Sequence, residues 1–171
     1  PILQKGLLEK GLCQVQDVAA GMAPTILDAQ PGEQVYDLCA APGTKSIMLS
    51  DMMNGEGSIL AVDQDARRLE KLAESALNYH AENIRIRRGD VTELELPPVA
   101  GVLLDAPCTG TGVIGKRADL RWRRTPEELA SIVQLQSKLL AQAATMVSKG
   151  GRLVYSTCSL EPEENWEQVQ A

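Results

Sequence analysis

Two cysteines in this 171-residue sequence stand where a thiol could act as a nucleophile. Cys108 closes the run Asp105-Ala-Pro-Cys108, and Cys158 is the central residue of Thr157-Cys158-Ser159. Each run follows a short apolar stretch that is typical of a β-strand. A lone cysteine at a strand end is more often structural than catalytic. Two cysteines at neighbouring strand ends, with a carboxylate beside one of them, favour nucleophilic chemistry by a thiolate.

A second group of residues predicts a site for an adenosine-bearing cofactor. The turn Cys39-Ala-Ala-Pro-Gly-Thr-Lys45 is made mostly of small residues and leads into a predicted helix, so its backbone N–H groups can approach a ligand. It is neither a GxxxxGK[ST] phosphate loop nor a GxGxxG dinucleotide turn. Asp63 and Asp90 follow the next two predicted strands, where an acid can bind ribose hydroxyls or adenine. S-adenosylmethionine fits this pattern; the alternative is that both acids only cap helices.

A basic segment follows the Cys108 run on an otherwise acidic chain. The net charge is −6, which argues weakly against a protein that simply coats nucleic acid. A local basic patch instead favours docking of a polyanion at one place, through phosphate contacts that do not read sequence. Trp122 lies within this segment and could stack on a splayed base, but we favour a place for it in the core. The basic residues of this patch are Lys116, Arg117, Arg121, Arg123 and Arg124.

Short β-like runs alternate with longer helical stretches, which predicts βαβ units and a doubly wound, mostly parallel sheet of the α/β class. In such a sheet the ligands lie beyond the carboxyl ends of the strands, where the acids, cysteines and glycine turns of this chain fall. The predicted strands are Val35–Cys39, Ser58–Asp63, Ile84–Arg88, Val102–Asp105 and Arg152–Ser156. The predicted helices are Gln14–Ala29, with Val18, Met22, Ile26 and Leu27 on one apolar side, Lys45–Met53, Ala66–His80, Pro126–Val147 and one from about Pro162.

The composition excludes several classes of protein. Hydrophobic residues make up 44% and charged residues 23%, as in a globular domain. No apolar run is long enough for a membrane span and no signal peptide opens the chain, so we expect a soluble, cytoplasmic, monomeric protein. The four cysteines form no CxxC pair, which argues against a metal site, and we interpret Cys13 and, less firmly, Cys39 as small buried hydrophobes. The chain starts at Pro1 and stops inside an apparent helix, so we expect a domain of a longer protein.

Four stretches of the sequence resemble the RsmB/NOP/Sun family of RNA (cytosine-5)-methyltransferases. They are Asp37–Ser46, LLDAPCTGTG (Leu103–Gly112), KRADLRW (Lys116–Trp122) and STCSLEPEEN (Ser156–Asn165), and Val15-Gln16-Asp17 looks like the short element that precedes the family's catalytic domain. The resemblance covers roughly residues 12 to 169 and is closest to the bacterial 16S ribosomal RNA type. It implies a Rossmann-like class I S-adenosylmethionine-dependent methyltransferase domain over residues 31–171, after a lead-in over residues 1–30, with C-terminal strands missing.

The resemblance also implies roles for individual residues. Cys158 would attack C6 of a cytosine, and Cys108 would assist loss of the C5 proton and release of the adduct. Asp105 would bind the N3/N4 edge of the base, with Lys45 near it; the alternative for Lys45 is a solvated helix residue. The cofactor residues would be the turn Cys39, Ala40, Ala41, Pro42, Gly43, Thr44 and Lys45, together with Asp63, Arg68, Asp90 and Asp105.

Small departures from the family pattern leave these residues intact. Thr44 stands where glycine is frequent, Thr109 where serine is frequent, and Ala118 where proline is common. The expected substrate is RNA, with ribosomal RNA favoured over transfer RNA. Two alternatives remain open: a cofactor-binding RNA scaffold without catalysis, and methylation of an exocyclic amine or a protein side chain. Enzymes of the latter kind typically carry Asn/Asp-Pro-Pro-aromatic after the fourth strand, where this chain has Asp-Ala-Pro-Cys.

Overall fold

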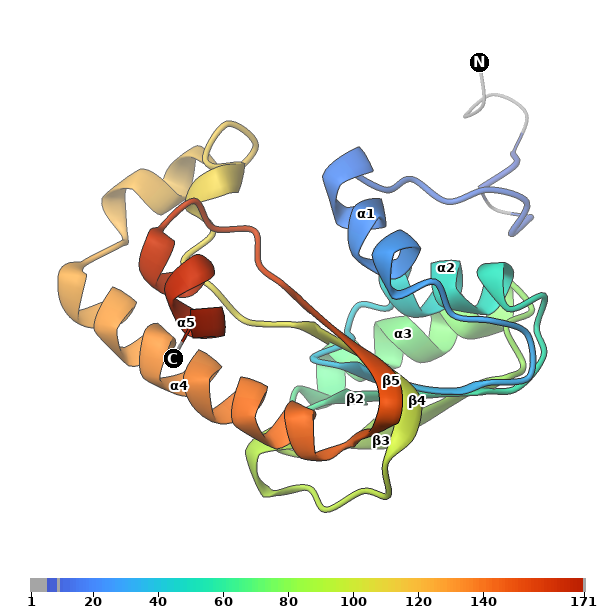
Figure 1. Ribbon diagram of the computed structural model, residues 1–171. Coiled ribbons are helices and arrows are strands. Elements are labelled where there is room, and N and C mark those ends of the chain that lie inside the picture. The colour runs from blue at the N-terminus through green and yellow to red at the C-terminus, as the bar shows by residue number, and fades with distance from the viewer. Residues whose placement is uncertain (1–5, 9, 171) are drawn as a thin grey trace.

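The computed structural model describes residues 6–8 and 10–170, which form one parallel sheet with helices on both faces (Figure 1). The strand order is β3-β2-β1-β4-β5, and every neighbouring pair is parallel. The order reverses between β1 and β4, the point at which doubly wound sheets open a crevice for ligands. This confirms the predicted fold class. The strands are β1 Gln34–Leu38, β2 Ser58–Asp63, β3 Ile84–Arg88, β4 Val99–Asp105 and β5 Val147–Ser156.

The described residues also form five α-helices and four short 3₁₀ turns, most of which lie between strands. The α-helices are α1 Val18–Leu27, α2 Thr44–Met52, α3 Ala66–Asn78, α4 Pro126–Thr145 and α5 Trp166–Gln170. The 3₁₀ turns are η2 Val91–Glu93, η3 Thr111–Val113, η4 Ala118–Trp122 and η5 Pro162–Glu164. Helices α1, α2 and α3 lie on one side of the sheet, and α4 and α5 lie on the other (Figure 1).

The central strands are buried on both faces, as the parallel arrangement requires. Alternate residues of β1 show this: Val35 packs on the side of α1 and α2, with Leu27 and Leu49, whereas Leu38 packs on the side of α4, with Leu139. The side chains therefore form two apolar layers with the sheet between them. These layers hold the strand ends in fixed positions, which is what a site built on several strands needs.

Side chains that accept hydrogen bonds start three of the helices. Asp17 accepts from the N–H of Ala19 at the start of α1, and Asp65 accepts from the first N–H groups of α3. Thr125 caps α4 and is followed by Pro126, whose missing N–H costs nothing at a first helical position. These caps agree with the predicted helix starts of α3 and α4.

The structure differs from the expected elements at several boundaries, among them the start of β4, which lies at Val99 rather than Val102. Helix α1 begins at Val18 rather than Gln14, and Met22 and Ile26 on its predicted apolar side are 57% and 63% exposed. The buried residues of α1 are Ala23, Pro24 and Leu27. Strand β5 begins at Val147 rather than Arg152, and α4 ends at Thr145 rather than Val147. The helix expected from Pro162 is a 3₁₀ turn followed by the short α5.

Among the described residues, no helix has both the length and the apolar character required to cross a membrane.

Candidate active site

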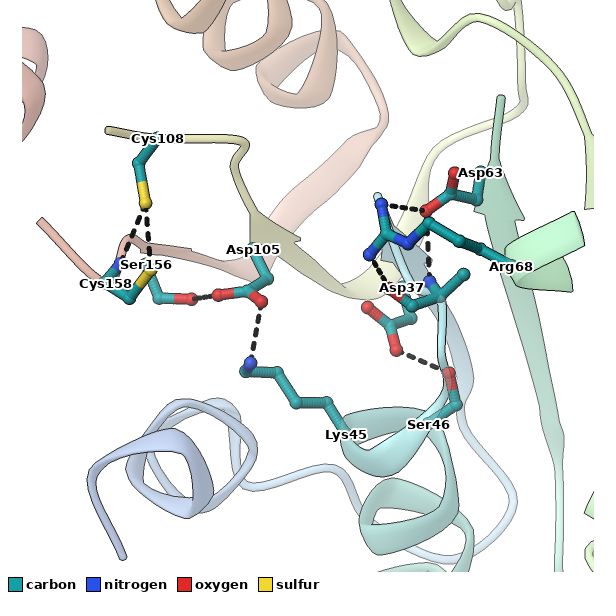
Figure 2. A network of polar contacts seen from close by, with 10 residues as sticks. Asp37, Lys45, Ser46, Asp63, Arg68, Asp105, Cys108, Ser156 and Cys158 are labelled. Carbon is teal, nitrogen blue, oxygen red and sulfur yellow. Dashed lines mark hydrogen bonds and ion pairs between the residues drawn. The ribbon is translucent and has the colours of Figure 1, made fainter. Parts of the chain in front are cut away.

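The carboxyl ends of β1, β2, β4 and β5 bring the predicted site residues together at one edge of the sheet (Figure 2). Cys108 and Cys158 follow β4 and β5, which are neighbouring strands, as expected. Asp105 ends β4 between these cysteines and the turn after β1. The prediction that two thiols and a carboxylate share one place is confirmed by this geometry.

The turn after β1 is held by hydrogen bonds of its own backbone and by β2. The N–H of Ala40 donates to the carbonyl of Val62 at 2.9 Å, and the N–H of Gly43 donates to the carbonyl of Ala40 at 2.9 Å. Gly43 has a φ of +105°, and a Cβ at this position would lie 2.7 Å from Cγ of Leu72. Only glycine fits here, because the chain must turn sharply against a buried leucine before α2 begins.

Asp63, at the end of β2, is nearly fully buried and fixes this turn. Its carboxylate accepts hydrogen bonds from the N–H of Ala41 at 3.1 Å and from the N–H of Asp65 at 2.9 Å. The guanidinium of Arg68 lies 3.6 Å from the same carboxylate and also donates to the carbonyl of Ala41. The cap of α3 is Asp65, so Asp63 is not a helix cap.

Asp90 follows β3, and the structure shows its contacts within the chain and its position at a cavity. It caps η2 by accepting from the N–H and the hydroxyl of Thr92 at 2.9 and 2.7 Å, and it also lines a cavity at the sheet edge. Because Thr92 contacts only one carboxylate oxygen of Asp90, the other remains available to a ligand.

A cavity of about 470 Å³ joins the two predicted groups of residues, and its volume lies within the usual range for small-molecule sites. The turn after β1 contributes Cys39, β2 contributes Asp63, and the β4 and β5 ends contribute Asp105 and both cysteines of the thiol pair. Asp63 lies at one end of this cavity, and the thiols of Cys108 and Cys158 lie at the other (Figure 2). The lining residues are Cys39, Asp63, Gln64, Arg68, Gly89, Asp90, Val91, Asp105, Ala106, Pro107, Cys108, Arg117, Leu135, Leu139 and Cys158.

A second cavity, of about 510 Å³, lies on the other side of Asp105 and Cys158. Its walls come from α1, from η3 and from the segment after β5. Asp105 and Cys158 line both cavities, so they stand at the boundary between them. Two molecules bound in the two cavities would meet at these side chains.

The two thiols are in direct contact. The Sγ atoms of Cys108 and Cys158 are 3.1 Å apart without a disulfide bond, and the N–H of Cys158 donates to Sγ of Cys108 at 3.3 Å. A hydrogen bond from the Cys108 thiol lowers the pKa of Cys158 to about 7. The same hydrogen bond, together with burial and the charge on Cys158, raises the pKa of Cys108. Of the two thiols, Cys158 therefore has the lower pKa and ionises more readily.

Asp105 is held by partners on both of its oxygens. Nζ of Lys45 lies 2.7 Å from Oδ2, and the hydroxyl of Ser156 donates to Oδ1 at 2.7 Å (Figure 2). The side chain of Lys45 is 15% exposed, so it points into the site from the start of α2 rather than into solvent. Of the two interpretations of Lys45, the geometry favours the one at the reaction site.

Burial raises the pKa of two further groups next to the site. Asp37 on β1 is buried and accepts from the hydroxyl of Ser46 at 2.5 Å; burial raises the pKa of Asp37 to about 7. Burial and the charge of Asp63 raise the pKa of Cys39 to about 12, so this thiol is not ionised near neutral pH. Cys39 therefore lines the cavity without acting as a nucleophile.

The basic segment lies beside the site but does not have one uniform role. Lys116 pairs with Asp17 at the start of α1, and Arg117 and Arg123 lie 3.5 and 3.6 Å from Asp119. Arg124 is partly buried; it donates to the carbonyl of Thr109 at 2.6 Å and pairs with Glu128. Arg124 thus stabilises the loop that carries Cys108.

The prediction that Trp122 fills the core is wrong. Its side chain is 89% exposed at the end of η4. The buried residue of this turn is Leu120, two positions earlier. Trp122 is therefore presented among the basic residues of η4.

The sequence patterns single out neither of two side chains that support the site. Glu164 is fully buried and accepts hydrogen bonds from residues in the loops of both cysteines. Ser156, which supports Asp105, was likewise not singled out. Nothing in the local pattern separates Glu164 from Glu163, because only long-range packing buries one and exposes the other.

Comparison with protein families gives a match over residues 24–171 to the model described as 16S rRNA methyltransferase RsmB/F. A relative from Synechocystis sp., named probable ribosomal RNA small subunit methyltransferase B, is 42% identical over 165 residues, which cover 94% of this chain and 37% of the relative. The ribosomal RNA small subunit methyltransferase B of Photorhabdus laumondii is 38% identical over 169 residues, covering 95% of this chain and 38% of its own. The chain thus spans less than two fifths of the length of these relatives.

Solved structures agree with the sequence comparison. The crystal structure of NSun6 from Pyrococcus horikoshii with SFG, an analogue of S-adenosylmethionine, has a TM-score of 0.90 and 31% identity, covering 96% of this chain and 42% of its own. A methyltransferase homologue from Pyrococcus horikoshii has a TM-score of 0.87 and 35% identity, covering 99% and 54%. An O-methyltransferase from Thermotoga maritima, at 15% identity and a TM-score of 0.67, shares the fold.

Proposed function

The chain belongs to the 16S rRNA methyltransferase RsmB/F family, and on this premise we propose that it transfers a methyl group from S-adenosylmethionine to C5 of a cytosine in ribosomal RNA. One observation carries the proposal. The thiolate of Cys158, its proton donor Cys108 and the carboxylate of Asp105 lie together at the boundary of two cavities. A methyl donor in one cavity and a base in the other would meet there.

The residues of the first cavity fit S-adenosylmethionine. The carboxylates of Asp63 and Asp90 suit ribose hydroxyls and the adenine amino group. Of the turn after β1, Cys39 lines this cavity, and the methionine part would lie against that end of the turn. No phosphate-binding loop is present in this turn, which suits a cofactor without phosphate. S-adenosylmethionine, when bound, supplies an electrophilic methyl group.

Cys158 makes the base reactive. Cytosine C5 is a poor nucleophile, so the thiolate first adds to C6, and the C5=C6 electron pair becomes available at C5. C5 would then form a bond to the methyl group while the bond from that methyl group to the sulfonium sulfur breaks, and the cofactor would leave as the neutral thioether. Loss of the proton from C5 and cleavage of the C6–S bond restore the C5=C6 double bond and return the Cys158 thiolate.

Cys108 becomes a base only after this addition. In the free protein its pKa is raised by the hydrogen bond to Cys158, by burial and by the charge of Cys158. Once Cys158 is bonded to C6, its sulfur carries no charge, so two of these three causes disappear. The Cys108 thiol can then lose its proton to water of the cavity that it lines, and the resulting thiolate accepts the C5 proton, which couples its activation to formation of the adduct.

Asp105 orients the base, and Lys45 and Ser156 orient Asp105. The carboxylate accepts a hydrogen bond from the N4 amino group of cytosine with one of its remaining lone pairs, which fixes the base with C6 toward Cys158. Lys45 and Ser156 prevent rotation of this carboxylate, at 2.7 Å each. The target cytosine must leave its stack to reach this position.

RNA containing 5-fluorocytosine tests this chemistry, because fluorine at C5 cannot leave as a cation and the adduct persists. We expect a covalent RNA–protein complex on denaturing gels that requires S-adenosylmethionine. Cys158→Ala is expected to abolish both the complex and methyl transfer while it still binds the cofactor. Cys108→Ala is expected to accumulate a complex even with unmodified RNA, since release fails. Cys13→Ala, which lies outside the site, serves as the control.

Other outcomes have definite meanings. A complex that persists in Cys158→Ala and is absent in Cys108→Ala would reverse the two roles. No complex with any variant, despite bound cofactor, would reject cytosine-5 chemistry and favour the scaffold or another acceptor. The substrate itself is identified by mapping 5-methylcytosine in ribosomal and transfer RNA from a deletion strain, where loss at a ribosomal position is expected.

A further inference from the structure

A buried carboxylate lies behind the thiol pair. Glu164 belongs to η5, and its side chain is fully inaccessible to solvent, whereas the neighbouring Glu163 is exposed. An ionised carboxylate without partners in such a place would be strongly unfavourable. The hydrogen bonds of Glu164 therefore have to compensate for the loss of solvation of its carboxylate.

Glu164 accepts four hydrogen bonds, two on each oxygen. Oε1 accepts from the N–H of Thr109 at 2.8 Å and from Nε2 of Gln136 at 3.0 Å. Oε2 accepts from the hydroxyls of Thr109 and Ser159. All the lone-pair positions of the carboxylate are occupied. Burial raises the pKa of Glu164, but the hydrogen bonds from Ser159, Thr109 and Gln136 together lower it by more, so its pKa lies below the ordinary value.

The partners of Glu164 stand next to the cysteines. Thr109 directly follows Cys108, and Ser159 directly follows Cys158. Gln136 of α4 uses its second N–H to bind the carbonyl of Pro107 at 2.9 Å, on the other side of Cys108. Glu164 thus connects two loops that come from different strands, at the positions that set where their sulfur atoms lie.

We infer that Glu164 is a positioning residue that holds the Cys108 and Cys158 loops in register, so that the Cys108 thiol donates its hydrogen bond to Cys158. The catalytic consequence rests on the proposed function, but the geometric one does not. A change of a few tenths of an ångström in either loop would weaken the sulfur–sulfur contact of 3.1 Å. Without this contact the Cys158 thiol would return toward its ordinary pKa, about 8.5.

The other charged groups near Cys158 do not depend on Glu164. Asp105 and Lys45 face the thiol from β4 and α2, and their effects on its pKa are opposite in direction. Further charges line the two cavities at Arg117, Lys116 and Asp17. In the described part of the chain, none of these five side chains forms a hydrogen bond or ion pair with Glu164. A change in the pKa of Cys158 on substitution of Glu164 would therefore reflect a displacement of the two cysteine loops.

Two substitutions of similar size separate hydrogen bonding from packing. In Glu164→Gln the amide oxygen can replace Oε1, and the amide N–H groups can donate to the hydroxyls of Thr109 and Ser159, which reverse direction. Glu164→Met fills the same space but accepts almost nothing, so the N–H of Thr109 is left unpaired. Glu163→Gln and Glu163→Met are the matched surface controls.

The experiment follows alkylation of Cys158 by iodoacetamide as a function of pH, with the modified peptide quantified by mass spectrometry. Binding of S-adenosylmethionine and thermal unfolding are measured on the same samples. In Glu164→Met we expect the alkylation midpoint to rise by about one pH unit, which makes the reaction at pH 7 about fivefold slower, with cofactor affinity within about threefold of wild type. In Glu164→Gln we expect the midpoint to rise by less than half as much as in Glu164→Met. In both Glu163 variants we expect the midpoint of the wild type.

An unchanged midpoint in a folded Glu164→Met variant would overturn the inference. So would an equal shift in the Gln and Met variants, because hydrogen bonding would then not be the cause. If Glu164→Met does not fold, Ser159→Ala removes one of the four hydrogen bonds; a smaller rise in the midpoint supports the role, and no rise overturns it. Alkylation requires neither RNA nor methyl transfer, so the result is independent of the adduct assay that tests the proposed function.

Discussion

At the scale of single residues, two chemically identical side chains are made different by a contact of 3.1 Å. One thiol donates the hydrogen bond and keeps its proton, and the other accepts it and ionises more readily. A thiol with a pKa of about 8.5 is only about 3% ionised at pH 7, whereas one with a pKa of about 7 is half ionised. This is a gain of about 15-fold in thiolate, or about 1.6 kcal/mol, so most of the acceleration must come from orientation and polarisation of the base.

The pH dependence of adduct formation tests this division of roles. The thiolate is the reacting form, so the rate should rise with pH, pass its midpoint near 7 and then level off. Cys108→Ala removes the donor, and we expect the midpoint to move up toward 8.5 and the rate at pH 7 to fall about 15-fold. Cys108→Ser keeps an O–H donor and should lie between the two.

Single-turnover reactions with 5-fluorocytosine RNA across a pH series provide the measurement. They follow formation of the complex and not its release, which Cys108→Ala also impairs. A midpoint in Cys108→Ala that equals that of the wild type would mean that another group lowers the Cys158 pKa.

At the scale of elements, the site depends on how sharply the chain turns between β1 and α2. Gly43 makes this possible through a positive φ and through the absence of a Cβ, which would meet Leu72 of α3. The buried carboxylate of Asp63 then fixes the turn from β2. Three elements therefore define the cofactor end of the cavity together.

Gly43→Ala is expected to destabilise the protein more than Gly55→Ala. Both glycines have positive φ, of +105° and +72°, but a Cβ at Gly55 meets nothing within 4 Å. Gly55→Ala should therefore cost about 1 kcal/mol of unfolding free energy from backbone strain alone, and Gly43→Ala about 2–4 kcal/mol.

Urea denaturation measures these free energies, and calorimetry measures binding of S-adenosylmethionine. Only Gly43→Ala should weaken binding of the cofactor, by about tenfold, because the turn must move to make room for the Cβ of the introduced alanine. Equal effects of the two variants on binding would indicate that the turn after β1 does not hold the cofactor.

At the scale of the whole molecule, an acidic chain presents a basic surface at one edge. The net charge is −6, yet η4 and its flanks carry Arg117, Arg121 and Arg123 around the exposed Trp122. Such a distribution attracts an RNA to the edge that holds the thiols and repels it elsewhere. Arg124 differs from its neighbours because it supports the carbonyl of Thr109 in the Cys108 loop.

Salt-dependent RNA binding distinguishes these residues. Arg121→Gln is expected to weaken binding to different RNA sequences about equally and to lower the slope of log affinity against log salt by about 1. Trp122→Ala should reduce binding by about 1–3 kcal/mol if a base stacks on the indole, with unfolding free energy changed by less than about 0.5 kcal/mol.

Lys149→Gln, an exposed lysine at the opposite end of β5, is the control and should leave the slope unchanged. Arg124→Gln should instead lower the unfolding free energy. Should Arg121→Gln and Lys149→Gln have the same effect, the basic segment would not be the RNA-binding surface.

The sequence by itself determined the elements, the edge of the sheet at which the chemistry gathers, and the family. Alternating apolar runs located all five strands of the sheet, although the predicted ranges missed the first residues of β4 and β5. The residues that end these strands identified the thiols and the carboxylates of the site. These features are local: a strand, a turn or a motif is specified by residues a few positions apart.

Only the tertiary structure decided which residues touch. Cys108 and Cys158 are 50 positions apart, and Glu164 is 55 positions from Thr109, so their contacts depend on the packing of β4, β5 and α4 as a whole. The same packing buries Glu164 but not Glu163, exposes Trp122, and turns Val18, Met22 and Ile26 of α1 to solvent. Local patterns cannot specify such choices, because a side chain's burial depends on what the rest of the chain places against it.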